Sequence, residues 1–266
     1  MPNTATASGD NVVKQDVNLY LTVMIGHNQF VINTSCIAGI IEKPLINTVP
    51  FLPSGIAGVV NYRGNIIPVY DMRVLLGMPD FNTEKAGLTA ALIQRKVDHQ
   101  NWLKELESSV MENRKFTLQT DPHKCKFGVW YDNYRTDDFD LHNTLQLFDA
   151  PHKSIHKLAE ETEGFISSGE RDKAMNLINI TGKSILSSMI KLFDRVTGLI
   201  HSIDKRLLVI AFVGDSKKAL LIDAANDAVK IDPSCFKDNK TALDSPHKFV
   251  ELKTGIAELL SPESLF

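Results

Sequence analysis

The sequence has little cysteine, no long hydrophobic run and no excess of basic residues. Its three cysteines are odd in number and far apart, so a disulfide scaffold is not expected. No uninterrupted apolar stretch approaches the roughly 18 residues of a membrane helix. The first residues lack a basic segment followed by an apolar one. We therefore expect a soluble, cytoplasmic protein with no direct membrane insertion.

The charge balance narrows the class of partner. Lysine and arginine number 29 against 32 acidic residues, which gives a formal net charge of −3, and no basic tract is present. Such a chain has no electrostatic footprint for nucleic acid or for an anionic membrane. With 266 residues, 43% of them hydrophobic, it can bury a substantial core in one large or two ordinary domains. The expected partners are proteins, small molecules or ions.

The hydrophobic pattern changes twice along the chain. Residues 1–17 are polar and are typical of a flexible tail. Short β-rich runs with two expected hairpins occupy 18–84, apolar residues recur at helical spacing over 85–202, and β-rich runs return over 203–266. Either β region alone would leave strand edges uncovered. We therefore expect the two β regions to pair, with the helical segment inserted between them.

A histidine lies on the apolar face of the first predicted helix. His99 shares this face with Leu92, Leu103, Leu106 and Val110, at spacings of three, four or seven residues. A single histidine in such a place is ordinarily a core side chain with a satisfied hydrogen bond. For His99 alone, the pattern favours that interpretation.

Two more histidines and a cysteine change the interpretation. His152 and His156 are four residues apart, just after a proline suited to a first helical turn, so their imidazoles project from one face. Cys125 precedes a compact turn at Gly128. Three imidazoles and one thiolate suit tetrahedral Zn²⁺ better than Mg²⁺ or Ca²⁺. Copper binds such ligands more tightly, so the choice of zinc rests partly on which metal a cytoplasm supplies.

The spacing alone leaves other interpretations open. The histidines and Cys125 can be unrelated core side chains, and His123, two residues before Cys125, can compete as a ligand. A hydrolytic zinc enzyme is a third alternative, with three histidines and a water in the fourth position. It requires Cys125 to stay off the metal, and no glutamate stands at the His-Glu-x-x-His spacing of a general base.

These residues carry a resemblance to a known domain. The segment from about 95 to 200 resembles the chemoreceptor zinc-binding domain, a four-helix bundle of bacterial signalling proteins. The resemblance rests on three motifs: His99-x-x-Trp102, Cys125-x-Phe127-Gly128-x-Trp130-Tyr131 and Pro151-His152-x-x-x-His156.

The resemblance to this domain implies a ligand set and a chemistry. The zinc ligands would be His99, Cys125, His152 and His156, and His123 would not be one. Hypochlorous acid would be a trigger that oxidises Cys125 and weakens the site. Relatives of such bundles often pair, so a homodimer through the bundle stays open.

The flanking β regions resemble the CheW domain. Residues 49–73 read VPFLPSGIAGVVNYRGNIIPVYDMR and residues 206–231 read RLLVIAFVGDSKKALLIDAANDAVKI. The resemblance covers about 18–80 and 203–266. It implies an α+β fold in which a discontinuous CheW domain, a pair of small β-barrels, is interrupted by an inserted four-helix bundle.

CheW-like proteins are adaptors between chemoreceptor cytoplasmic tips and a CheA-type histidine kinase, so the resemblance implies signalling without catalysis. It maps partner contacts onto Arg63, Asn61 and Ile37, although an arginine at a hairpin tip is also ordinary. Gly39 stands where relatives often carry a glutamate, and the last twenty residues match the usual ending weakly. The zinc would either regulate docking to the kinase and receptor or serve the fold alone.

Overall fold

The structure is a computed structural model that describes residues 18–136, 138–239 and 247–266. The predicted tail at 1–17 lies outside the described residues. The chain divides into a β unit, which runs up to Phe81 and resumes at Lys205, and a helical unit, Asn82–Asp204. The predicted boundaries lay at 84/85 and 202/203. Among the described residues, no helix combines the length and apolar character needed to cross a bilayer.

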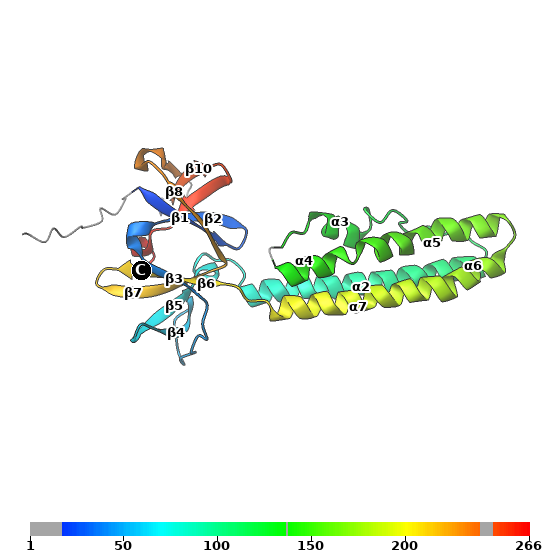
Figure 1. Ribbon diagram of the computed structural model, residues 1–266, viewed down its shortest axis with the longest axis horizontal. Helices are drawn as coiled ribbons and strands as arrows, with labels where there is room; N and C mark the ends of the chain where they lie inside the picture. The colour runs from blue at the N-terminus through cyan, green and yellow to red at the C-terminus, as the bar shows by residue number, and fades with distance from the viewer. Residues whose placement is uncertain (1–17, 137, 240–246) are drawn as a thin grey trace, which may run out of the picture. The chain divides into compact units, whose positions relative to one another are not determined.

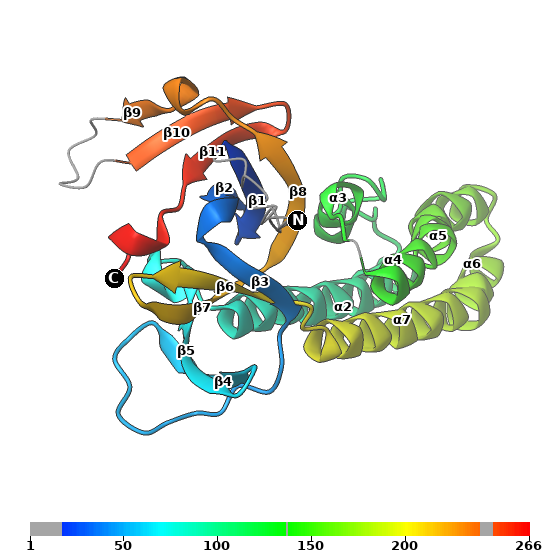
Figure 2. The same ribbon diagram turned by 60° about the vertical axis from the view of Figure 1, so that its left-hand side comes forward.

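The β unit contains two sheets (Figures 1 and 2). The six-stranded sheet has the order β8-β1-β2-β11-β10-β9, and the five-stranded sheet has the order β3-β6-β7-β5-β4. The strands are β1 (Leu19–Ile25), β2 (Asn28–Asn33), β3 (Ile37–Glu42), β4 (Ile56–Tyr62), β5 (Asn65–Asp71), β6 (Leu207–Val213), β7 (Ser216–Ile222), β8 (Ala224–Lys230), β9 (Lys237–Asn239), β10 (His247–Leu252) and β11 (Gly255–Leu259).

Strands from the two halves of the sequence pair with each other in both sheets. β1 pairs with β8 and β3 with β6, both antiparallel, whereas β2 pairs with β11 and β5 with β7 in parallel. The two expected hairpins are β1–β2 and β4–β5. The predicted pairing of the two β regions is therefore confirmed.

The predicted pair of closed β-barrels is wrong, because both sheets are open among the described residues. The five-stranded sheet does curl, so that the Tyr62 hydroxyl on β4 donates to the Ala38 carbonyl on β3 at 3.4 Å. Between β3 and β4, however, the chain carries three prolines, which have no N–H for a ladder. It makes one isolated bridge, between Asn47 and Val59. A side-chain contact thus takes the place of the closing ladder.

One hydrophobic cluster joins the two sheets of the β unit. It includes Val23 and Ile32 from the six-stranded sheet and Val209 and Leu220 from the five-stranded sheet, all buried. Strand alternation explains this packing, because every second side chain points to the same face. The interior of the unit is therefore shared by the two halves of the sequence.

The helical unit has a hydrophobic core of its own, formed mainly by α2, α5 and α7 (Figure 1). As predicted, Leu92, Leu103, Leu106 and Val110 are buried along α2. The elements are α2 (Phe81–Met111), α3 (Lys126–Asn133), α4 (Phe139–Gln146), α5 (Asp149–Ser167), α6 (Arg171–Leu177), a π-helical segment (Ile178–Gly182) and α7 (Lys183–Ser202). The predicted grouping into a four-helix bundle stays a prediction.

A largely buried ion pair ties the two halves of the β unit together. The Arg73 side chain, on the short helix α1 (Met72–Leu75), donates through Nε to both carboxylate oxygens of Asp223 at 2.9 Å. Asp223 follows β7 and also accepts from the backbone N–H of Gly26. Their side chains are only 8% and 15% exposed, so removal of either charge breaks a largely desolvated ion pair.

We expect Asp223→Ala to lower the free energy of unfolding of the β unit by about 3 kcal/mol, because a largely buried ion pair would lose one of its two charges. Urea unfolding followed by circular dichroism measures the change. Asp194→Ala is the control, since Asp194 is 59% exposed in its pair with Lys96 and should matter little. Equal effects of the two substitutions would contradict the role given to Asp223.

Candidate metal centre

Four side chains with metal-ligating atoms converge in the core of the helical unit. They are His99, Cys125, His152 and His156, and one ligand atom from each lies within 4.8 Å of all the others. They are the four residues that the sequence motifs singled out. Other groups of three or more such residues are absent from the part of the chain that the structure describes. The three histidines are buried, whereas Cys125 is partly exposed.

The backbone of α2 fixes the orientation of His99. Its Nδ1 lies 2.8 Å from the carbonyl oxygen of Arg95, one helical turn earlier. A carbonyl only accepts, so Nδ1 carries the proton and Nε2 presents a lone pair. Nε2 is buried and has no hydrogen-bond partner among the described atoms. This arrangement, with one ring nitrogen held by the backbone and the other free, is typical of a histidine that ligates metal.

The start of α3 positions Cys125. Cys125 is the N-cap of this helix, and its Sγ accepts from the backbone N–H of Gly128 at 3.2 Å. A Cβ at Gly128 would lie 1.8 Å from the carbonyl oxygen of Pro122, so only glycine lets the chain turn this tightly. The sulfur therefore sits at a helix N-terminus, where a thiolate is favoured, 3.2 Å from Nε2 of His152.

Helix α5 supplies the other two histidines. His152 and His156 lie one turn apart, with ring centroids 5.0 Å apart, and both are within 5.7 Å of the His99 ring. Neither ring nitrogen of His156 makes a well-formed hydrogen bond among the described residues, although both are buried and the Gln119 backbone lies near. Burial of a polar nitrogen without a partner costs free energy. The cluster is therefore an arrangement that a metal ion would satisfy.

Aromatic side chains pack around the three histidines. Phe127, the second residue of α3, packs edge-on against His99 and His152. Trp102 packs against His156 with centroids 5.0 Å apart, and its Nε1–H donates to the carbonyl of Gln119 at 2.8 Å. This bond ties α2 to the segment that leads to Cys125.

Burial also sets the protonation states of the cluster. It lowers the pKa of His152 to about 3, with added repulsion from His99 and His156, and lowers that of His156 to about 4. The pKa of His99 is lowered by burial, against the opposing hydrogen bond to Arg95. Burial raises the pKa of the Cys125 thiol, with the Gly128 N–H acting against it. Near pH 7 the metal-free site thus holds three neutral imidazoles and a thiol.

These lowered pKa values make the metal-free helical unit sensitive to acid. As the pH falls below about 6.5, the histidines of the unfolded chain take up protons that the buried ones do not. The unfolded state then binds more protons, so stability decreases as the pH falls from about 6.5 towards the folded values.

The donor set fits zinc. In a tetrahedral zinc site, neighbouring nitrogen and sulfur ligands lie about 3.3–3.6 Å apart, as the usual bond lengths require. The 3.2 Å separation of Cys125 Sγ and His152 Nε2 is close to this range. Neutral imidazoles and a thiol that can lose its proton are the ligands that zinc takes in closed sites. His123, the competing candidate, is exposed and pairs with Asp132 at 2.9 Å, outside the cluster.

The residues predicted to contact partners lie on the five-stranded sheet. Asn61 ends β4 and accepts from the Gly64 N–H at 2.9 Å, which closes the β4–β5 turn. Arg63 sits in that turn with φ at +52°, and its guanidinium lies 5.2 Å from the Tyr62 ring centroid. Ile37 begins β3, at the opposite edge of the sheet. The structure groups Asn61 and Arg63, and places Ile37 apart from them in strand order.

Gly39, which stands in place of a glutamate, has a steric role in this structure. A Cβ at Gly39 would lie 2.7 Å from the hydroxyl of Tyr62. A longer side chain would displace the tyrosine that links β4 to β3. The sequence alone indicates no physical reason for a glycine at this position.

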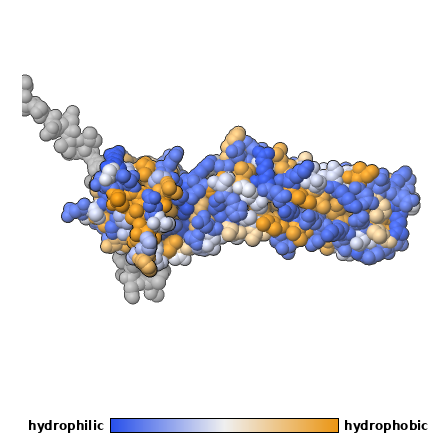
Figure 3. Space-filling model, turned by 90° about the horizontal axis from the view of Figure 1, so that it is seen from below, coloured by the Kyte–Doolittle hydropathy of each residue, from blue (hydrophilic) through white to orange (hydrophobic). Residues whose placement is uncertain are grey.

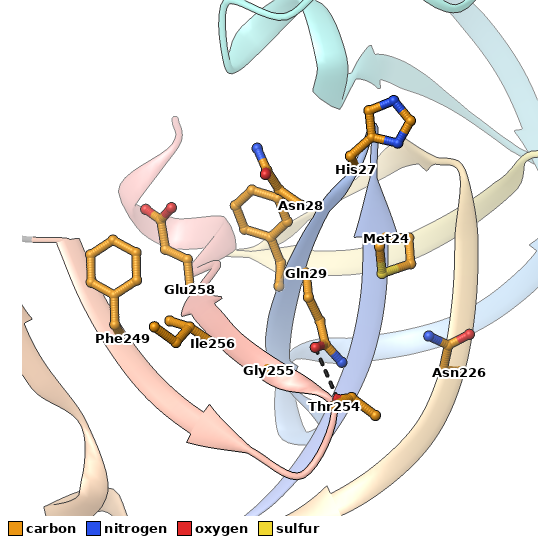
Figure 4. Close-up of a pocket in the computed structure, with 11 residues that line it drawn as sticks. Met24, His27, Asn28, Gln29, Asn226, Phe249, Thr254, Gly255, Ile256 and Glu258 are labelled. Carbon is orange, nitrogen blue, oxygen red and sulfur yellow. Dashed lines mark hydrogen bonds between the residues drawn. The ribbon is translucent and has the colours of Figure 1, made fainter. Parts of the chain in front are cut away.

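The β unit has a cavity of about 570 Å³ on its six-stranded sheet (Figure 4). Its lining includes Phe249, Ile256 and Glu258, and the Thr254 hydroxyl donates to Gln29 Oε1 at 3.0 Å. Among the described residues, this cavity holds no set of three or more side chains that could together bind a metal ion. This cavity offers apolar contact and hydrogen bonds, not metal coordination.

Two family models match the chain. The CheW-like domain matches residues 19–96, and the chemoreceptor zinc-binding domain matches residues 99–162. Along the sequence the zinc-binding match follows the CheW-like match, and neither match reaches residues 203–266. In the structure the helical unit, Asn82–Asp204, lies along the chain between the two parts of the β unit. The pairing of later strands with earlier ones is a separate observation of the structure.

Ten chains of solved structures are similar to this one. No curated protein matches the sequence. Among solved structures, the scaffolding protein TtCheW from Thermoanaerobacter tengcongensis is similar, with 11% identity over 94% of this chain and 92% of that chain and a TM-score of 0.44.

We expect zinc binding to release about one proton per ion near pH 7, because the histidines are already neutral and only the Cys125 thiol must ionise. Affinity should fall about tenfold per pH unit from pH 8 to 6. Calorimetry in buffers of different ionisation enthalpy measures the release. Cys125→Ser should release almost none. Release of two or more protons by the unaltered protein would show that the metal-free histidines are charged.

Proposed function

Because the chain carries a CheW-like domain and a chemoreceptor zinc-binding domain, we propose that it is a cytoplasmic chemotaxis adaptor whose docking responds to zinc. The β unit, residues 203–266 included, would dock to chemoreceptor tips and to a CheA-type histidine kinase. Arg63, Asn61 and Ile37 would contribute to these contacts. His99, Cys125, His152 and His156 would hold the zinc.

One observation carries the zinc part of this proposal. The unpartnered nitrogens of His99 and His156 point to a missing ligand, since a buried ring nitrogen without a hydrogen bond is costly. Unrelated core histidines would each have found a partner, as Nδ1 of His99 has done with Arg95. The convergence of a thiol on the same point favours zinc over the oxygen-preferring cations.

The connections of the helical unit favour a regulatory role. The Lys85 ammonium, near the start of α2, donates to the carbonyls of His201 at 3.0 Å and Ile203 at 2.7 Å. It thereby ties the helix by which the chain enters this unit to the end of the helix by which it leaves. Because His99 lies on α2, a shift of that helix on zinc binding would be felt at both connections to the β unit. Zinc would alter docking only through such a difference between two states.

Cys125 makes an oxidant response chemically reasonable. It is the ligand whose residue is partly exposed, whereas the three histidines are buried, which favours attack of an oxidant at Cys125. A zinc-bound thiolate attacked by hypochlorous acid gives a sulfenic acid and chloride, with two electrons passing from sulfur to chlorine. The product is a poorer ligand, and the site would lose affinity for zinc.

The competing enzymatic function has less support. A hydrolytic zinc needs an open position for water, and Cys125 Sγ lies inside the cluster. Four protein donors would complete a tetrahedral shell. Zinc that serves only the fold remains the second candidate, because a closed four-ligand site can supply folding free energy outright.

The surface of the helical unit leaves room for a homodimer. Hydrophobic residues show between hydrophilic ones on the face drawn in Figure 3. Among the exposed apolar residues of the unit are Ile93 on α2 and Ile180 in the π-helical segment, at 47% and 64% exposure. These exposed apolar residues are compatible with a homodimer formed through the helical unit.

We expect the affinity of the protein for a CheA-type kinase and a receptor tip to change about tenfold or more across a series of buffered free-zinc concentrations. Zinc content is measured on the same samples. Cys125→Ser should move the response to higher zinc, while His123→Ala, a histidine outside the cluster, should leave it in place.

The alternatives give different curves. Tight docking that stays flat while zinc occupancy changes would assign the metal to the fold alone. Absence of docking at every occupancy would overturn the adaptor function itself. The glycine at position 39, where relatives often carry a glutamate, would then indicate that the protein has other partners.

We expect Lys85→Met to separate zinc binding from docking. Zinc affinity should stay within about twofold, because Lys85 lies far along α2 from His99, but the zinc dependence of docking should shrink. Lys157→Met is the control, since that lysine pairs with Glu161 within α5 and joins no two helices. If Lys85→Met docked with the full zinc response, the connection through α2 and α7 would not carry it.

A further inference from the structure

Helix α2, which carries His99, begins within the β unit. Phe81 is the first residue of this helix and also the last residue of the β unit before the chain enters the helical unit. About five helical turns separate Phe81 from His99. Over that stretch α2 contains no proline and no π-helical turn, which are common causes of a kink. The backbone of α2 therefore runs without interruption from the β unit to a metal ligand.

Two arginines of the β unit hold the Phe81 ring. The guanidinium of Arg206 lies 4.3 Å from the ring centroid, and that of Arg73 lies 5.3 Å from it. Attraction between a guanidinium and an aromatic ring is strongest where water is excluded, and the two arginines are only 8% and 7% exposed. Arg206 lies one residue after Lys205, where the β unit resumes. The ring therefore joins the point where the chain leaves the β unit to the point where it returns.

Each arginine also pairs with an aspartate at one end of the five-stranded sheet. Asp223, the partner of Arg73, follows β7, and Asp71 ends β5, the parallel neighbour of β7. Arg206 Nη1 lies 3.5 Å from Oδ2 of Asp71, and these two side chains are 9% and 14% exposed. Because each positive charge has its own counter-charge, both arginines can lie over one ring. We call these four residues and Phe81 the Phe81 cluster, and its opening would disturb two largely buried ion pairs.

The Phe81 cluster lies at the ends of strands that lead to the predicted partner contacts. β5 runs from the turn that holds Arg63 to Asp71. β6 begins directly after Arg206 and pairs with β3, which Ile37 begins. Each predicted contact region therefore shares a strand or a strand pair with the cluster.

We propose that the Phe81 cluster transmits the state of the zinc site to the β unit. Zinc that joins His99 to the ligands on α3 and α5 restricts the motion of α2, and the continuous helix passes this restriction to Phe81. The cluster then opens less often, so the ends of β5 and β7 are steadier with zinc than without it. Such coupling needs an element with two states that both sites bias, and the closed and open forms of the cluster are these states. The inference rests on the proposed function for its role in signalling, but the coupling itself is measured without a docking partner.

Hydrogen exchange of the full-length protein at a series of buffered free-zinc concentrations tests the coupling. The backbone N–H groups of Arg73 and Val74 donate to Oδ1 of Asp71 at 3.0 and 3.4 Å. The backbone N–H of Gly26 donates to the Asp223 carboxylate. These three amides report the closed cluster, and we expect zinc to slow their exchange about fivefold or more. The ladder amides of β10 and β11, in the six-stranded sheet, are the internal reference and should change less than about twofold.

Matched variants test the role of Phe81. Phe81→Leu should abolish the zinc effect on the three amides, because leucine keeps an apolar helix start but has no aromatic face for the arginines. Its zinc affinity should stay within about twofold, since His99 lies several turns away. Phe139→Leu is the control, because Phe139 is also the first residue of a helix, α4, but is 75% exposed. Cys125→Ser should move the zinc effect to higher zinc, which would show that the metal acts at the four-ligand site.

The proposal is overturned if zinc leaves the three amides unchanged in the unaltered protein, or if Phe81→Leu keeps the full zinc effect. Circular dichroism and zinc content confirm that each variant is folded. If Phe81→Leu fails to fold, Arg206→Lys decides, since lysine keeps a charge for Asp71 but loses the flat guanidinium that stacks on the ring. The zinc effect should then fall at least by half, and a full effect would overturn the proposal.

The same measurements separate this inference from the proposed function. Slower exchange of the three amides with zinc, together with docking that does not respond to zinc, would support the coupling and count against zinc-dependent docking. Docking that responds to zinc without any change at the three amides would overturn the coupling and leave the proposed function in place.

Discussion

The helical unit depends on the burial of three imidazoles at one point. No hydrogen-bond network among the described residues satisfies them, since Nε2 of His99 and both ring nitrogens of His156 lack partners. Packing alone does not explain this, because apolar side chains of similar size would fill the same space without the desolvation cost. The aromatic shell of Phe127 and Trp102 makes the site dry, which raises that cost further and strengthens any metal–ligand bond formed inside it.

The chain reaches this point from three directions, and each approach has its own fixing interaction. On α2 the carbonyl of Arg95 holds His99, and the Trp102 indole holds the segment at Gln119. At α3 the Gly128 turn holds Cys125 as a helix cap. On α5 the helical repeat itself sets His152 and His156 one turn apart. Rigid supports of this kind hold metal ligands in the orientation that a metal site requires.

The sequence predicted the local structure of this protein better than it predicted whether the sheets close. Helical spacing found the buried stripe of α2, and the four-residue step found the histidine pair, because both follow from 3.6 residues per turn. Strand runs and turn signals found the two hairpins. The sequence did not predict that the sheets are open. The edges of the five-stranded sheet meet only through the Tyr62 side chain and the Ala38 carbonyl, and not through a ladder of backbone hydrogen bonds, among the described residues. Such a contact leaves no periodic trace. The Arg95 carbonyl was also missed, although an acceptor one turn before an inward histidine is a regular feature of helices.

The ligand set contains one thiolate and three imidazoles, and this difference decides how the site would respond to a chemical change at sulfur. Loss of the Cys125 thiolate leaves three neutral imidazoles in place, so the metal site would weaken without collapse of α2 against α5. The same chemical change falls on the sulfur that accepts from the Gly128 N–H and caps α3. The first structural consequence would therefore fall on α3 and on the segment that the Trp102 bond holds at Gln119. In the proposed adaptor, that segment is where a chemical change at sulfur becomes a change of shape, and α2 carries it towards the β unit.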